Sequence, residues 1–176
     1  MTPTTNRVIQ MLSTALELED EGFHFYDRTS AGCVNDVGIK IFQSLRDDEM
    51  VHAQRIKLIY QSLTGGMGWT TDWKNLPPAH TGMQVWFRDL FDKQPAIRPE
   101  VCEISAVEIG LELEVKSVKF YEQHLAPAVD PSEREFLITL SREEQGHYAL
   151  LADLKLYLTD PSSWFLERQR GILDGV

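Results

Sequence analysis

The chain has 176 residues, 43% hydrophobic and 25% charged, which suits one globular domain, residues 1–176, around a single core. Lys and Arg number 17 against 27 Asp and Glu, and the resulting net charge of −10 disfavours nucleic acid and anionic membrane surfaces as partners. Two cysteines without a Cys-x-x-Cys pair exclude a zinc ribbon, a rubredoxin-type iron site and a disulfide framework.

Helical signals dominate the chain from its beginning. Gly65 and Gly66 end a second periodic segment, Pro99 opens a third, and Asp130 followed by Pro131 has the cap and first-turn residues of a fourth. The four long helices are therefore predicted at about residues 6–30, 38–63, 99–125 and 131–158. A short C-terminal helix is expected after Pro161.

The connection over residues 64–97 is much longer than the other two links. Within it, an apolar i, i+3, i+4 pattern predicts a short helix at about 82–92, which we expect to cover one side of the core. Short links make helices antiparallel neighbours, whereas the long link lets the third helix start from the opposite end. The expected fold is all-α: a ferritin-like antiparallel four-helix bundle with one long crossover.

The strongest feature of the sequence is an internal duplication. Residues 15–26 (ALELEDEGFHFY) align with 110–121 (GLELEVKSVKFY), and 48–52 (DEMVH) align with 143–147 (EEQGH), both at an offset of 95 residues. One register therefore relates two helical hairpins. Packed face to face, they would be related by an approximate two-fold axis, so any site on that axis would receive matching side chains from both.

The first helix of each hairpin has one carboxylate in the middle of its apolar face. Glu19 and Glu114 lie on these apolar faces, whereas Glu17 and Glu112 fall on solvated faces two residues away. The sequence therefore predicts that Glu19 and Glu114 are buried.

The second helix of each hairpin carries Glu-x-x-His in its apolar face, as Glu49 with His52 and Glu144 with His147. No basic residue is expected on these faces, and unpaired charges in a core cost several kcal/mol each. Two divalent cations would neutralise four carboxylates and leave the imidazoles as neutral donors. The pattern favours a dinuclear metal site.

At these positions the sequence resembles the ferritin-like di-iron superfamily, most closely the rubrerythrin-type proteins. The family pattern is one Glu from each of two helices and Glu-x-x-His from each of the other two. The resemblance implies that Glu49 and Glu144 bridge two iron ions, with Glu19 and Glu114 as terminal ligands beside the nearer His. All six ligands match: Glu19, Glu49, His52, Glu114, Glu144 and His147.

The resemblance also implies roles beyond the ligands. Asp48 would accept a hydrogen bond from His147 and Glu143 from His52, although both are equally interpretable as exposed acids. Tyr26 and Tyr121 would donate to ligand carboxylates, or would be plain core aromatics.

Three departures from related proteins are visible. No Cys-rich rubredoxin segment is present, so we expect electrons from an external donor protein or from Fe(II) itself. Rubrerythrins carry a further Glu where this chain has Ser117, and Gly22 in the other half. Met50 lies where bacterioferritins place a haem ligand, but haem is not expected because a helix-surface Met usually only packs.

Oxygen-rich ligation with two imidazoles favours Fe or Mn, and Mn or Zn could substitute for iron. The leading hypothesis is an oxidoreductase that reduces hydrogen peroxide, or oxidises Fe(II) with O₂ or peroxide. Alternatives are a ferritin-like iron-binding or storage protein, a hydroxylase-like di-iron enzyme, and an interaction module with a vestigial site.

A homodimer is expected, with Trp69, Trp73 and Trp86 of the crossover as candidate contacts. No apolar run approaches the ~20 residues that span a bilayer, and the first ten residues lack an apolar signal core. Together with the cysteine usage, this leads us to expect a cytoplasmic protein.

Overall fold

The computed structural model describes residues 3–77 and 101–166. Its four long helices are α1 (Pro3–Gly32), α2 (Asp36–Thr64), α4 (Val101–Leu125) and α5 (Pro131–Thr159), with a short 3-10 helix, η1 (Asp72–Asn75), after α2. Residues 161–166 are helical too, and the described residues contain no strand. The prediction of an all-α four-helix bundle is confirmed.

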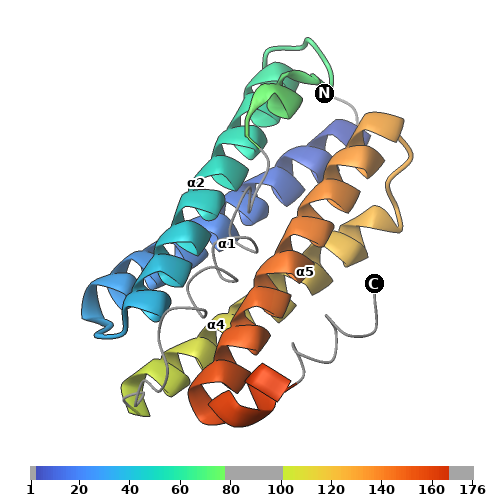
Figure 1. Ribbon diagram of the computed structural model, residues 1–176. Helices are drawn as coiled ribbons and strands as arrows, with labels where there is room; N and C mark the ends of the chain where they lie inside the picture. Colours follow the sequence, from blue (N-terminus) through green and yellow to red (C-terminus); the bar gives the residue numbers. More distant parts are fainter. Residues whose placement is uncertain (1–2, 78–100, 167–176) are drawn as a thin grey trace.

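The helices form two antiparallel hairpins (Figure 1). Helix α1 packs along α2 and α4 along α5, while contacts between the hairpins are fewer. Helix α2 ends and α4 begins at opposite ends of the bundle, which is the arrangement that one long crossover requires (Figure 1). The helix predicted at 82–92 lies outside the described residues.

Side-chain caps fix where two of the helices begin. Asn35 precedes α2 and its side chain accepts from Val37 N at 2.8 Å, while Asp130 precedes α5 and accepts from Ser132 N at 2.8 Å. Helix α2 ends at two glycines, and Gly66 has a φ of 77°, which favours glycine.

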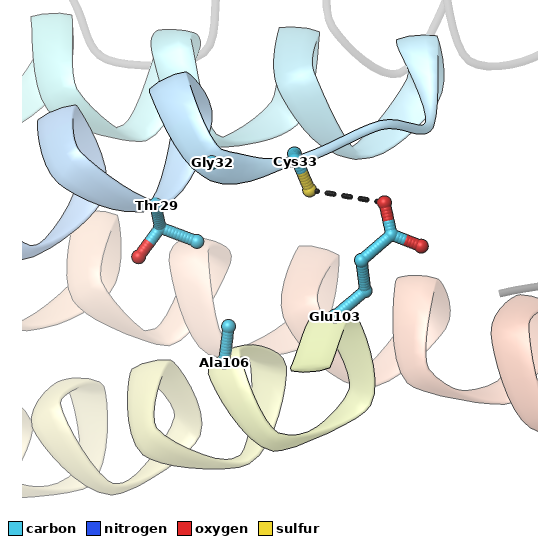
Figure 2. Close-up of a pocket in the computed structure, with 5 residues that line it drawn as sticks. All are labelled: Thr29, Gly32, Cys33, Glu103 and Ala106. Carbon is cyan, nitrogen blue, oxygen red and sulfur yellow. Dashed lines mark hydrogen bonds between the residues drawn. The ribbon is translucent and has the colours of Figure 1, made fainter. Parts of the chain in front are cut away.

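The turn between α1 and α2 is attached to α4 by a buried carboxylate. Glu103 Oε1 accepts from the backbone N–H groups of Val34 at 3.1 Å and Asn35 at 2.9 Å. The thiol of Cys33 donates to the same oxygen at 3.3 Å (Figure 2), and both residues line a cavity of about 180 Å³. Glu103 thus orders the turn that sets the register of α1 against α2.

Two apolar clusters fill the bundle on either side of its middle. One contains Phe42 and Leu45 of α2 with Leu151 and Leu154 of α5, and the other contains residues such as Ile56 of α2 and Leu140 of α5. Along α2 and α5, the buried residues between these clusters are polar. The core therefore encloses a polar layer at mid-height.

Two tryptophans of the crossover, Trp69 and Trp73, lie within the described residues. Trp73 of η1 is 5% exposed and packs edge-on against Phe136, with 5.3 Å between ring centroids, and Trp69 packs against the same ring. Trp73 is therefore part of the core, Trp86 lies outside the described residues, and the homodimer stays a prediction. Among those residues, no helix combines the length and apolar character needed to cross a bilayer.

Candidate metal centre

The structure brings the six predicted ligand residues together in the polar layer, and each is 4% exposed or less. They come from all four helices: Glu19 from α1, Glu49 and His52 from α2, Glu114 from α4, and Glu144 and His147 from α5. Glu17 and Glu112, two residues before Glu19 and Glu114, are exposed. Helical periodicity thus separates the buried carboxylates from the solvated ones.

The six residues form two overlapping groups of four. One group contains Glu19, Glu49, His52 and Glu144, and the other contains Glu49, Glu114, Glu144 and His147. Within each group the potential ligand atoms lie within 4.8 Å of one another. Glu49 and Glu144 belong to both groups.

In the first group, the carboxylates surround Nδ1 of His52. This nitrogen lies 3.1 Å from Glu19 Oε2, 3.3 Å from Glu49 Oε2 and 3.0 Å from Glu144 Oε1. Three oxygens and one imidazole nitrogen therefore face a common point.

The second group repeats this arrangement around Nδ1 of His147. That nitrogen lies 3.5 Å from Glu49 Oε1, 3.5 Å from Glu114 Oε2 and 3.3 Å from Glu144 Oε2. Glu49 and Glu144 each direct one carboxylate oxygen toward His52 and the other toward His147. A carboxylate that offers one oxygen to each of two positions has the geometry of a bridge between two cations.

The outer nitrogen of each imidazole faces an acid from the other hairpin. Glu143 Oε2 lies 2.9 Å from His52 Nε2, and Asp48 Oδ2 lies 3.6 Å from His147 Nε2. An acceptor at Nε2 keeps the proton there and leaves the Nδ1 lone pair directed at the cluster.

Two buried tyrosines, Tyr26 and Tyr121, donate across the hairpins. The Tyr26 hydroxyl donates to Glu114 Oε1, and the Tyr121 hydroxyl donates to Glu19 Oε1. Both contacts obey the same 95-residue register as the duplication. Each tyrosine holds the carboxylate that belongs to only one of the two groups.

The expectation that no basic residue lies on these faces is wrong at one position. Arg55 of α2 is 3% exposed and donates from Nη1 to Glu143 Oε2 at 2.5 Å. It lies three residues after His52, one turn further along the same face, and this spacing was the signal that could have identified it.

Burial and mutual repulsion shift the pKa values of the cluster. Burial, together with Glu144, raises the pKa of Glu49 well above its usual range, and burial raises the pKa of Glu114 to about 8. Burial opposes the charged form of His52, but Glu144 and Glu19 outweigh it and raise the pKa of His52 well above 6.5. Without a bound cation, protons must therefore neutralise part of the negative charge of the carboxylates.

The residues present fit a bound cation. Within residues 3–77 and 101–166, neither buried oxygen of Glu144 has a hydrogen-bond partner of suitable geometry. Buried carboxylate oxygens of this kind are unfavourable without a positive partner, and carboxylate and imidazole together suit Fe, Mn or Zn. The cluster therefore has the chemistry of a metal site.

Two positions singled out in the sequence also have clear surroundings. Met50 is 45% exposed on α2, so it lies away from the cluster. Gly22 of α1 faces Glu49, because a Cβ added there would lie 3.3 Å from Glu49 Cδ and Oε1. Its counterpart, Ser117, is half-buried.

A family model described as Rubrerythrin matches residues 10–155. This range contains every residue of the Glu/His cluster and its tyrosine and acid neighbours. A search of curated proteins found no match, and a search of solved structures found none.

Proposed function

Because the chain belongs to the rubrerythrin family, we propose that it is a di-iron oxidoreductase that reduces hydrogen peroxide or O₂. The observation that carries this proposal is the pair of four-residue groups that share Glu49 and Glu144. Four buried carboxylates balance two divalent ions in charge, whereas a single ion would leave two of them without a cation.

The residues would divide between the two positions as the distances indicate. Glu19 and His52 would hold one ion, Glu114 and His147 the other, and the two shared carboxylates would bridge them. Bound as Fe(II), the two ions would supply two electrons to peroxide or O₂.

The rest of the chain would orient these ligands and keep bulk water out. Tyr26 and Tyr121 fix the terminal carboxylates, and Glu143 and Asp48 face the outer imidazole nitrogens. The apolar clusters above and below exclude solvent and lower the local dielectric, which strengthens each of these contacts.

The electrons for repeated turnover would come from outside these 176 residues, since they contain no Cys-x-x-Cys site. An external redox protein, or Fe(II) as the substrate, fits this requirement. We also propose a homodimer as the working assembly.

The test is to load the protein with Fe(II) without oxygen, count bound iron, and follow its oxidation by H₂O₂ and by O₂ separately. Two irons per chain, oxidised much faster by peroxide and reducible again, would support the peroxidase function. Rapid oxidation by O₂ with continued iron uptake, in a particle of hundreds of kilodaltons, would favour a ferroxidase and storage function instead.

A matched pair of variants ties the result to the cluster. Glu49→Ala should lose bound iron, while Glu17→Ala, which changes an exposed carboxylate, should retain it. Wild-type protein without bound iron, or full iron in Glu49→Ala, would refute the proposal.

A further inference from the structure

Arg55 connects three separate parts of the fold. Its guanidinium donates from Nη1 to Glu143 Oε2 of α5 and from Nη2 to the carbonyl of Pro77, both at 2.5 Å. The side chain is 3% exposed. A planar fork held at two points is far less mobile than an ordinary surface arginine.

The same oxygen of Glu143 also serves His52. Glu143 Oε2 lies 2.9 Å from His52 Nε2, so the contacts run from Pro77 through Arg55 and Glu143 to the imidazole. An acceptor anchored in this way fixes both the ring orientation and the tautomer of His52.

The two-fold relation between the hairpins breaks at this point. The residue that corresponds to Arg55 in the second hairpin is Leu150, which has no charge to offer. The acid facing His147 is Asp48, one methylene shorter than Glu143, and its oxygen lies 3.6 Å from Nε2. The contact of Glu143 with His52 is thus shorter than that of Asp48 with His147, and Arg55 has no charged counterpart at the duplicated position.

We infer that Arg55 is a positioning residue for the metal position formed by Glu19, Glu49, His52 and Glu144. Through Glu143 it holds the imidazole of His52 in its binding geometry and so tightens metal binding at that position. This inference rests on the proposed function, because it requires that the cluster binds metal ions.

Pre-organisation is the physical reason for this effect. A ligand already held in its binding geometry loses less conformational freedom when the ion arrives. The positive charge of Arg55 opposes the binding of a cation only weakly, because the carboxylate of Glu143 neutralises that charge at 2.5 Å. Loss of a residue that hydrogen-bonds a ligand imidazole typically lowers metal affinity by about 10- to 100-fold, and Arg55, which acts through Glu143, should give the lower end of this range.

Two single-site backgrounds separate the positions experimentally. His147→Ala leaves the position beside His52, and His52→Ala leaves the position beside His147. Metal-free protein of each background is titrated with Co(II), which does not oxidise during the experiment, and binding is followed by calorimetry and visible absorption.

Arg55→Met should weaken Co(II) binding by roughly tenfold in the His147→Ala background and by less than about twofold in the His52→Ala background. A general loss of packing would weaken both backgrounds alike, so this selectivity distinguishes positioning from structural support.

Two further variants keep the test informative if Arg55→Met folds poorly, which circular dichroism would reveal. Arg55→Lys keeps the charge but not the two-point fork, and should give a smaller loss confined to the His147→Ala background. Arg46→Met is the control, because Arg46 of the same helix pairs with Asp47 and Asp27 at the surface.

Equal weakening in both backgrounds, or none in His147→Ala, would overturn the inference while leaving the proposed function intact. Failure of the wild-type protein to bind Co(II) would overturn both.

Discussion

The imidazole rings of His52 and His147 lie nearly parallel, with 5.4 Å between their centroids and 20° between their planes. They come from different hairpins, yet both direct Nδ1 toward the carboxylates of Glu49 and Glu144. A change in either shared carboxylate should therefore affect both halves of the site.

Glu144→Gln tests this sharing. The carboxamide keeps the shape of the side chain but removes its charge and one acceptor oxygen, so we expect fewer than two tightly bound ions per chain. Elemental analysis after dialysis measures the stoichiometry. Glu112→Gln, on an exposed position, should leave the count unchanged, and two retained ions in Glu144→Gln would contradict a bridging role.

Tyr26→Phe removes the donor to Glu114 without creating a large cavity. Hydrogen bonds to charged groups contribute about 1.5–3 kcal/mol, so the metal-loaded variant should lose a free energy of unfolding of that order. Urea unfolding measures it. Tyr121→Phe should behave alike because it removes the matching contact to Glu19. Tyr148→Phe, which alters an exposed ring, should have little effect, and an unchanged Tyr26→Phe protein would refute the prediction.

Gly22→Ala should lower metal affinity while hardly changing the stability of the metal-free protein. The new methyl would lie 3.3 Å from Glu49 Cδ and Oε1, so the carboxylate must move by a few tenths of an ångström. Ala also favours the helix by up to ~1 kcal/mol, which offsets this crowding in the free energy of unfolding.

The matched control for Gly22→Ala is Gly32→Ala, because a Cβ at Gly32 meets nothing within 4 Å. Co(II) titration of both variants measures affinity, and thermal unfolding of the metal-free forms measures stability. We expect a roughly tenfold loss of affinity for Gly22→Ala alone. Equal affinity in the two variants would show that Glu49 accommodates the methyl group.

The metal-free protein should become less stable as pH rises from about 5 to 8. Folding raises the pKa of Glu114 from 4.5 to about 8, so the folded state holds more protons than the unfolded state across this range. The raised pKa values of Glu49, His52 and His147 act in the same direction, whereas the lowered pKa of Glu144 changes stability only below about pH 5, where the unfolded state takes up its proton. The stability present at low pH is thus lost as pH rises.

Bound metal should reverse this trend, because it displaces those protons and binds more tightly as they leave. The gain in melting temperature on adding Mn(II) should therefore grow between pH 5 and 8. Differential scanning calorimetry with and without Mn(II) measures both slopes. Glu114→Gln should flatten the metal-free slope, and a melting temperature that rises with pH in metal-free protein would contradict the assignment.

The sequence by itself determined which side chains share a face. A helical period of 3.6 residues places Glu19 on an apolar face and Glu17 on a solvated one, whatever the helix packs against. The 95-residue register then related the two hairpins, and the caps at Asp130 and Gly65–Gly66 marked helix ends from local chemistry alone. These features depend on neighbours within one or two turns.

Only the tertiary structure decided which partners meet across helices. Arg55 reaches Glu143 because α2 and α5 approach each other there, and Tyr26 reaches Glu114 rather than another carboxylate because of how α1 lies against α4. Trp73 is buried because η1 folds back onto Phe136. Such contacts join residues 63 to 88 positions apart. The distance and angle between packed helices set them, and no local pattern in the sequence encodes either quantity.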